Sequence, residues 1–234
     1  MARPARPDAS SSADVARARI LVFAKVPVAG AVKTRLEPRI GSVNAARLHA
    51  AFLEDVVASA RQVAEVVLYH DPGEPGPVLA SLGIELKPQQ GSHLGERMAN
   101  AIGAEIRAGV EKVLVLGSDS PDLPRSRLLA AVAALEGAPV VIGPAVDGGY
   151  YLVGVRGLPP EALFRDIPFG GREVLAATLA AVRAASLDVA LLEPWYDIDR
   201  PEDLDFLRTH LEFLSVAGGE ERCPATRRVL ASLP

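Results

Sequence analysis

Short apolar runs alternate with longer amphipathic stretches along most of this chain. Runs of three to five apolar residues recur at 20–24, 66–69, 113–116, 140–142 and 189–192. A weaker run occupies residues 84–86, and residues 150–155 follow a glycine-rich hinge. Between the runs, apolar residues return at helical spacing, as in 43–64 and 125–135. This alternation predicts a three-layer α/β/α sandwich with a mostly parallel sheet.

The chain is expected to consist of a single domain with an additional segment at each end. Residues 1–17 are rich in Pro, Ala, Ser and Arg and lack apolar periodicity, so a disordered tail is expected there. Residues 18–214 are enough for one domain with a sizeable core. Residues 215–234 are left as a C-terminal extension.

The central apolar run, 113–116, leads into the sequence Gly-Ser-Asp-Ser-Pro-Asp at 117–122. This pattern predicts a buried strand and then a loop, and ligand crevices in such sheets lie outside the carboxyl ends of the strands. Asp119 is at this end, where its carboxylate could hold Mg²⁺ that is bound to a nucleotide. The alternative is that Ser120 or Asp122 caps the next helix.

A loop with three cations, Lys25, Lys33 and Arg35, follows the first predicted strand. Because the loop lies at the carboxyl end of that strand, its cations suit the phosphates of a nucleotide, and Gly30 allows a tight turn. Val32 precedes Lys33 where a Walker A loop needs Gly, and no G-x-G-x-x-G follows the strand, so both of these phosphate loops are excluded. A solvated basic loop is the alternative.

The stretch 89–98 opens another predicted helix and contains Gly91, Gly95 and Arg97. Glycine permits close approach of a backbone, and the free amides of a helix start attract anions. These three residues are therefore candidates for binding the nucleotide or its phosphates.

Two more carboxylates, Asp197 and Asp199, follow the last predicted strand. Residues two apart in an extended segment point to the same side, so both carboxylates could face one cation. Asp199 also precedes Pro201 at a predicted helix start, where it could serve as the N-cap. The two roles are compatible, with Asp199 capping and Asp197 coordinating.

The sequence Asp147-Gly148-Gly149-Tyr150 lies between two predicted strands. Asp-Gly is a strong hairpin signal, so a turn is one interpretation of this segment. The alternative is a role in binding the substrate or acceptor, for which these four residues are the candidates.

Composition narrows the classes of function. The 234 residues are 49% apolar and carry a net charge of -4 with scattered basic residues, so no footprint for nucleic acid or an anionic membrane is visible. The single Cys223 excludes an internal disulfide framework and fits a reducing compartment. No segment reaches the roughly 18 consecutive apolar residues of a membrane span. A cytoplasmic protein is expected, and the absence of a G-x-S-x-G elbow disfavours nucleophilic hydrolase chemistry.

Five motifs occur in order between residues 20 and 206: FAKVPVAGAVKTRL, GSHLGERM, GSDSPDLP, GPAVDGGYYLVGV and DIDRPEDL. This set resembles the bacterial GT-A-fold transferases described as glycosyltransferase-like, of the nucleotide-diphospho-sugar transferase superfamily. It is more distantly similar to 2-phospholactate guanylyltransferases and molybdenum-cofactor nucleotidyltransferases. The resemblance implies a GT-A-like catalytic domain in which Lys33 and Arg35 meet the nucleotide phosphates. It also implies a metal site at Asp119, Asp197 and Asp199.

The expected function is a Mg²⁺- or Mn²⁺-dependent transferase with Asp119, Lys33 and Arg35 as candidate catalytic residues. The resemblance places glycosyl transfer from an NDP-sugar to a small-molecule acceptor first. Lys33 and Arg35 favour the alternative, nucleotidyl transfer from an NTP, because a departing pyrophosphate needs cations nearby. A third candidate, a nucleotide-binding module without catalysis, conflicts with three strand-end carboxylates that would repel phosphate in the absence of a metal. The sequence does not identify the base, the sugar, the acceptor or the oligomeric state.

Overall fold

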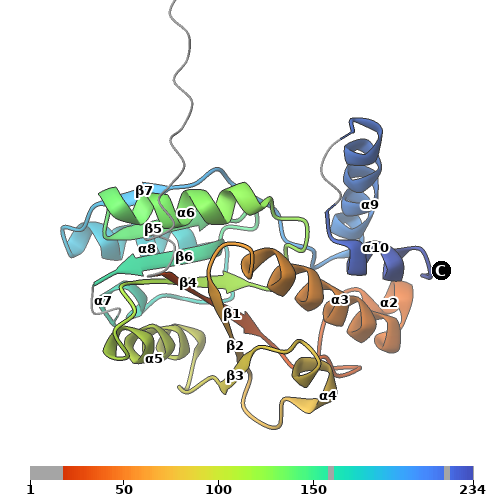
Figure 1. Ribbon diagram of the computed structural model, residues 1–234, viewed down its shortest axis with the longest axis horizontal. Helices are drawn as coiled ribbons and strands as arrows, with labels where there is room; N and C mark the ends of the chain where they lie inside the picture. Colours follow the sequence, from red (N-terminus) through yellow and green to blue (C-terminus); the bar gives the residue numbers. More distant parts are fainter. Residues whose placement is uncertain (1–17, 158–160, 219–221, 234) are drawn as a thin grey trace, which may run out of the picture.

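Seven strands form one sheet through the middle of the protein (Figure 1). The computed structural model describes residues 18–157, 161–218 and 222–233, so the predicted tail at 1–17 lies outside the described residues. The strand order is β3 (Glu85–Pro88), β2 (Glu65–His70), β1 (Ala18–Ala24), β4 (Lys112–Gly117), β6 (Tyr150–Arg156), β5 (Val140–Pro144) and β7 (Val189–Leu191). Among the described strands, β6 alone runs against its neighbours. The prediction of a mostly parallel sheet is confirmed.

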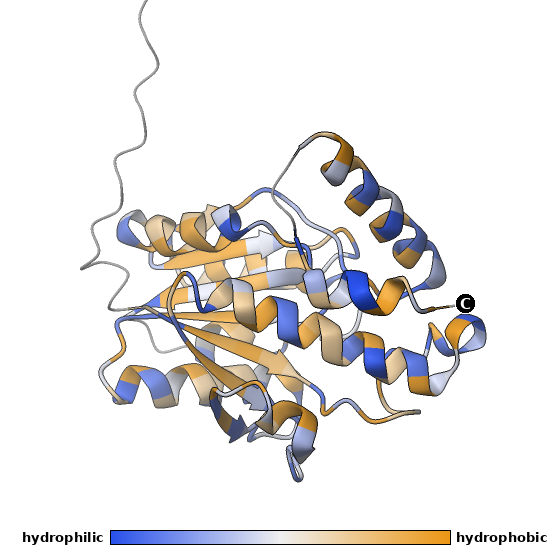
Figure 2. Cartoon of the chain, turned by 45° about the vertical axis from the view of Figure 1, so that its right-hand side comes forward, coloured by the Kyte–Doolittle hydropathy of each residue, from blue (hydrophilic) through white to orange (hydrophobic). Residues whose placement is uncertain are grey.

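Helices cover both faces of the sheet. One face packs against α3 (Ser42–Ala60), α4 (Gly76–Ala80) and α6 (Arg125–Gly137). The other packs against α5 (Leu94–Arg107), α7 (Glu161–Phe164) and α8 (Val174–Ala184). Successive side chains of a strand point to opposite faces, so Ile20 and Val22 of β1 enter the first layer whereas Leu21 and Phe23 enter the second. Figure 2 shows the apolar residues concentrated on the strands, and the predicted three-layer sandwich is confirmed.

A third apolar cluster lies beside the sandwich, between α3, α2 (Glu37–Ile40), α9 (Pro201–Val216) and α10 (Pro224–Leu230). The buried Asp55 of α3 accepts hydrogen bonds from the backbone amides of Ala225 and Thr226, at 3.0 and 2.7 Å. These amides belong to the start of α10, where a helix leaves its first N–H groups without partners. Through Asp55, part of the expected C-terminal extension is attached to α3.

The short helices α2, α7 and α10 are not predicted by the sequence pattern. The first two have four residues each, too few to show a helical period. The amides that begin α10 are bound by a residue distant in the sequence, which leaves no local signal. None of the helices in the described ranges has the length and apolar character needed to cross a membrane.

Candidate functional site

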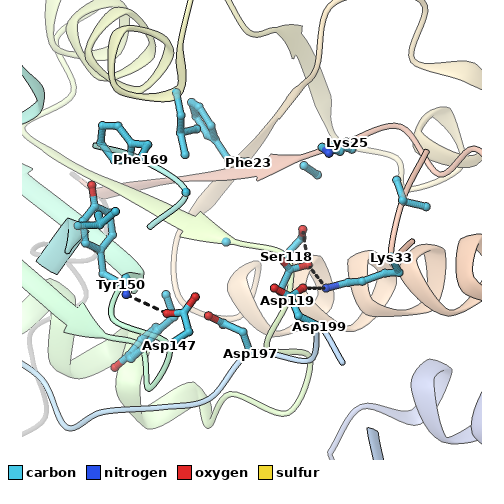
Figure 3. A pocket seen from close by; sticks show the side chains of 18 of the residues that line it. Phe23, Lys25, Lys33, Ser118, Asp119, Asp147, Tyr150, Phe169, Asp197 and Asp199 are labelled. Atoms are coloured by element: carbon cyan, nitrogen blue, oxygen red, sulfur yellow. Dashed lines mark hydrogen bonds and ion pairs between the residues drawn. The ribbon is translucent and has the colours of Figure 1, made fainter. Parts of the chain in front are cut away.

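A cavity of about 1020 Å³ opens at the carboxyl ends of β1 and β4 (Figure 3). Its walls come from the loop after β1, the first turns of α5, the end of β4, the β5–β6 hairpin and two further segments, 169–172 and 196–203. The predicted site residues on these walls are Lys25, Lys33, Arg35, Arg97, Asp119, Asp147, Gly149, Tyr150, Asp197 and Asp199. Segments that are far apart in the sequence thus meet where strand-end loops were expected to bind a ligand.

Lys33 forms the centre of the charged end of this cavity. Its Nζ lies 2.6 Å from Asp119 Oδ1 and 2.9 Å from Asp199 Oδ1. Nζ also donates a hydrogen bond to the carbonyl oxygen of Ile198 at 2.6 Å. The Lys33 side chain is only 4% exposed, whereas the two carboxylates are 40% and 39% exposed. The ammonium therefore lies beneath two acids that remain open to the cavity.

The backbone of Lys33 has a φ of 49°, in the left-handed region that residues other than glycine seldom adopt. Such a conformation costs about 1–3 kcal/mol and persists where surrounding contacts hold it, often at functional sites. Here the contacts to Asp119, Asp199 and Ile198 hold the side chain in place. The structure thus gives the Lys33 amine carboxylate partners, whereas the sequence predicted phosphate.

The charges of this cluster stabilise one another. Burial alone would lower the pKa of Lys33, but the negative charges of Asp119 and Asp199 outweigh it and raise the pKa above its ordinary value. Burial likewise would raise the pKa of Asp119, and Lys33 holds that pKa below its ordinary value instead. Both residues are therefore ionised at neutral pH.

Asp197 lies in a different electrostatic environment. Its pKa is raised to about 7, mainly by burial and further by the negative charges of Asp119 and Asp147. The Ser120 hydroxyl donates to Asp197 Oδ1 at 2.6 Å and opposes the shift in part. A carboxyl group perturbed in this way beside other acids marks a place where an added positive charge is stabilised.

The capping alternatives for the acidic residues are wrong. The N-cap position of α6 is occupied by Pro124, which has no side-chain acceptor, while Ser120 and Asp122 bond to Asp197 and Trp195 instead. The N-cap position of α9 is occupied by Arg200 rather than Asp199, and Asp203 accepts from the backbone amide of Arg200 at 2.7 Å. Asp119 and Asp199 therefore have no capping duty that would account for them.

The Asp147–Gly149 segment is the hairpin turn that joins β5 to β6. The Gly149 amide donates to Asp147 Oδ1 at 2.8 Å, and the Val146 amide donates to the Trp195 carbonyl at 2.9 Å. Gly148 has a φ of +97°, and a Cβ there would lie 2.3 Å from the carbonyl oxygen of Arg172. The turn interpretation is correct, and the same turn holds Asp147 on the cavity wall.

Four predicted glycines, Gly30, Gly91, Gly95 and Gly148, are not on the described cavity wall. A Cβ at Gly95 would lie 2.5 Å from Phe169 Cε2 and 2.8 Å from the Phe164 carbonyl oxygen, which gives this glycine a packing reason. One amide expected to attract an anion, that of Glu96, instead donates to the ring of His93 at 3.3 Å.

Several wall residues are absent from the sequence prediction, including His49, Arg172 and Tyr196. His49 lies on the buried face of α3, and its Nε2 is 3.1 Å from the Lys25 carbonyl oxygen. Helical spacing gives no sign that this face reaches the cavity. Arg172 follows Gly170 and Gly171, and a cation in a glycine-containing loop is the pattern that marked Lys33 and Arg35, so Arg172 could have been identified from the sequence. Within the described ranges, no group of three or more His, Cys, Asp or Glu side chains is arranged to hold a metal ion.

Comparisons with known proteins agree with this fold. The family model described as "Uncharacterized protein conserved in bacteria (DUF2064)" matches residues 53–171. No protein of curated function matches the sequence. A crystal structure from Desulfovibrio desulfuricans G20, provisionally described as a nucleotide-diphospho-sugar transferase, is 32% identical, with a TM-score of 0.83 over 93% of this chain and 95% of that chain.

Two more distant structures share the fold alone. The 4-diphosphocytidyl-2C-methyl-D-erythritol synthase of Anaerococcus prevotii DSM 20548 is 14% identical, with a TM-score of 0.59 over 86% of this chain and 100% of that chain. A CMP:2-keto-3-deoxy-manno-octonic acid synthetase complexed with CTP is 13% identical, with a TM-score of 0.56 over 83% and 98%. The likeness to the Desulfovibrio structure confirms the predicted nucleotide-diphospho-sugar transferase type of fold.

Proposed function

This chain belongs to the DUF2064 family, and we propose that it transfers a sugar from an NDP-sugar donor to a small-molecule acceptor. The observation that carries the proposal is the meeting of Asp119, Asp197 and Asp199 with Lys25 and Arg35 on one cavity. Acids and cations on the same wall suit a phosphate chain that is bound together with a divalent cation. The donor named in the description of the Desulfovibrio protein supports the same class.

Asp119 and Asp199 could hold a divalent cation because each carboxylate has a second oxygen besides the one that contacts Lys33, and both side chains are about two fifths exposed at the cavity. Mg²⁺ at a nucleotide site commonly uses one or two carboxylates and takes phosphate oxygens and water as its other ligands. Because no three such side chains of the described residues are arranged around one metal position, we propose Asp119 and Asp199 as the direct ligands and Asp197 as a contact through metal-bound water. When bound, Mg²⁺ or Mn²⁺ would neutralise the phosphate charge that develops as the donor bond breaks.

The remaining side chains divide the work between donor and acceptor. Arg35, which is 62% exposed and lies 3.7 Å from Asp199, and Lys25 are proposed to bind the donor phosphates. Lys33 keeps Asp119 ionised, and its contacts to Asp119 and Asp199 hold both carboxylates in position. Asp147, fixed by its bond from the Gly149 amide, is proposed to bind the acceptor.

Nucleotidyl transfer from an NTP is the second candidate. Its support in the sequence was the pair of cations Lys33 and Arg35, which a pyrophosphate leaving group would need. The structure directs the Lys33 amine to Asp119 and Asp199, so Arg35 and Lys25 would have to serve that leaving group. This commitment of Lys33 favours the NDP-sugar.

A nucleotide-binding module without catalysis is the third candidate. Six aspartates line the described cavity, among them Asp119, Asp147, Asp197 and Asp199. A phosphate chain brought next to them without a metal would be repelled. The aspartates on the cavity wall would therefore weaken nucleotide binding in a module that works without a metal.

The test measures thermal stabilisation and product release with panels of NDP-sugars and NTPs, each with and without Mg²⁺. The proposal predicts Mg²⁺-dependent stabilisation by at least one NDP-sugar and release of the nucleoside diphosphate. Stabilisation by NTPs with pyrophosphate release, and no response to any NDP-sugar, would establish the second candidate instead. Binding that is indifferent to Mg²⁺ and without turnover would favour the third.

Arg35→Ala and Arg39→Ala form a matched pair for this test. Arg39 is a nearby cation whose partner is Asp205, outside the cavity wall. Loss of a charge-assisted bond to phosphate costs roughly 1.5–3 kcal/mol, so Arg35→Ala should weaken NDP-sugar binding at least tenfold. Arg39→Ala should leave it unchanged. Equal effects of the two substitutions would remove Arg35 from the donor site.

A further inference from the structure

A fully buried carboxylate, Asp122, lies three residues beyond Asp119 but not on the cavity wall. The indole Nε1 of Trp195 donates to one of its oxygens at 3.3 Å. The hydroxyl of Tyr196 donates to the other oxygen, and Nδ1 of His210 lies 3.1 Å from it. A buried carboxylate is tolerated only when such partners replace the water that it has lost.

Two of these partners immediately precede the acids of the proposed metal site. Trp195 and Tyr196 stack on each other with ring centroids 5.4 Å apart, and Asp197 follows them. Burial and the neighbouring Asp122 raise the pKa of Tyr196, so its hydroxyl remains protonated as a donor. Asp122 thus holds the segment 195–199 by accepting hydrogen bonds from its first two residues, Trp195 and Tyr196.

Two further contacts join the loop 119–122 to the same segment. The Ile198 amide donates to the Asp119 carbonyl oxygen at 2.8 Å, and the Ser120 hydroxyl donates to Asp197. Three residues of the loop, Asp119, Ser120 and Asp122, therefore hold the segment through four hydrogen bonds. The position of Asp199 relative to Asp119 depends on these bonds.

We infer that Asp122 is a positioning residue, which sets the separation of the acids around the cation site by holding Trp195 and Tyr196. It is not on the described cavity wall and acts through the segment 195–199. This role accounts for a buried acid where an apolar residue would fill the same space without the cost of desolvation. The part of the inference that concerns the affinity for a cation rests on the proposed function. The part that concerns the position of the segment 195–199 rests on the structure alone.

The experiment compares Asp122→Asn with Asp55→Asn, the same change at another buried carboxylate. Asp55 binds the start of α10 and makes no described contact with 195–199, so it controls for loss of a buried charge. Three quantities are measured in each variant: the dissociation constant of Mn²⁺ alone, the amide hydrogen exchange of Ile198, and the emission of Trp195, the only tryptophan in the chain.

Groups that orient the ligands of a metal typically change its affinity 10–100-fold when they are lost. Asp122→Asn should therefore weaken Mn²⁺ binding at least tenfold, speed exchange at Ile198 by about the same factor, and shift the Trp195 emission. Asp55→Asn should lower the melting temperature and leave all three unchanged. If Asp122→Asn does not fold, Tyr196→Phe keeps the ring, removes one donor and should move the first two readouts in the same direction.

An Asp122→Asn protein that is less stable, yet matches Asp55→Asn in Mn²⁺ affinity and Ile198 exchange, would overturn the inference. If the wild type binds no Mn²⁺, the cation part of the proposed function fails. The exchange rate of Ile198 then decides the positioning role by itself, because faster exchange in Asp122→Asn alone supports it and unchanged exchange refutes it.

Discussion

Two charged clusters of this chain are built with opposite burial. Around Glu105 the acid is inside, 1% exposed, and accepts from Tyr69 at 2.7 Å, from Lys87 at 2.8 Å and from Arg19. The cations lie nearer the surface, with Arg19 and Lys87 18% and 34% exposed. At the cavity the order is reversed, because Lys33 is inside and its two acids are open.

This difference separates stability from function. The Glu105 carboxylate has three donors within the protein and little surface to offer a ligand. Asp119 and Asp199 share one buried ammonium and keep about two fifths of their side-chain surface toward the cavity. An internal cation thus allows acids to be gathered at a ligand site without strong repulsion between them. We expect changes in the first cluster to alter the free energy of unfolding and changes in the second to alter activity.

The largest effect is expected for Asp119→Asn, which keeps the shape of the side chain and removes its charge. The variant should lower turnover by about 10²–10³-fold, because it weakens binding of the cation that would neutralise the charge developing on the donor phosphate. Its melting temperature should fall less than that of Glu105→Gln, because the buried Lys33 ammonium keeps Asp199 and the Ile198 carbonyl as partners and Asp119 is 40% exposed.

Donor turnover and thermal unfolding are measured on the same preparation. Wild-type turnover in Asp119→Asn would refute the catalytic role of this acid. A fall of many degrees in melting temperature would instead place the cavity cluster with the Glu105 cluster and remove the contrast between them.

Glu105→Gln should show the opposite behaviour. Hydrogen bonds to charged groups contribute roughly 1.5–3 kcal/mol, and the partners here are partly exposed, so a loss of about 2 kcal/mol is expected. For a chain of this size that loss lowers the melting temperature by several degrees. Urea unfolding checks the change, and donor turnover of the folded variant should equal that of the wild type. Reduced turnover at full folding would show that this cluster also serves the cavity.

Much of the fold follows from local patterns, but the direction of β6 follows from the turn before it and not from its apolar run. The apolar runs at 20–24 and 113–116 form β1 and β4 as predicted. A strand that is covered on both faces needs apolar side chains on both, which gives a continuous apolar run in the sequence. An alternating or apolar run looks the same in either direction, so the antiparallel course of β6 depends on the turn at Asp147–Gly149. The start of α10 depends on Asp55, which no local signal identifies.

The site was also predictable in part: the grouping of its acids could be expected, whereas the contacts between its side chains could not. Asp119, Asp197 and Asp199 follow strands, and the ends of parallel strands gather ligand-binding loops, so their presence on one cavity could be expected. The partner of Lys33 could not, because a cation in a loop suits phosphate and carboxylate equally until the distant Asp199 is in place. Asp119 and Asp122 lie in one loop with the same chemistry, and only tertiary packing turns one to the cavity and the other inward.

The pH dependence of stability offers a finer test of the Glu105 cluster. Burial alone would raise the pKa of Glu105, but its bonds from Lys87, Tyr69 and Arg19 outweigh burial and lower that pKa. The unfolded chain has the ordinary value, about 4.3, so the cluster stabilises the folded state above that pH. This contribution is lost as the pH falls through the lower pKa of the folded state. The difference between wild type and Glu105→Gln, measured by urea unfolding from pH 7 to pH 3, should be constant down to about pH 5 and then shrink. A difference that grows toward low pH would contradict the assignment.

The smallest effect is expected where neither partner of an ion pair is buried. Arg228 lies 2.9 Å from Glu54, and their side chains are 71% and 58% exposed. Exposed pairs contribute little because water screens the charges and long side chains lose freedom when they pair, so Arg228→Ala should change the unfolding free energy by less than about 0.5 kcal/mol. Urea unfolding at low and high salt measures the change, with Glu105→Gln as the reference. A loss as large as that of Glu105→Gln would mean that pairing itself, rather than burial of one partner, decides the effect, and the comparison of the two clusters would lose its basis.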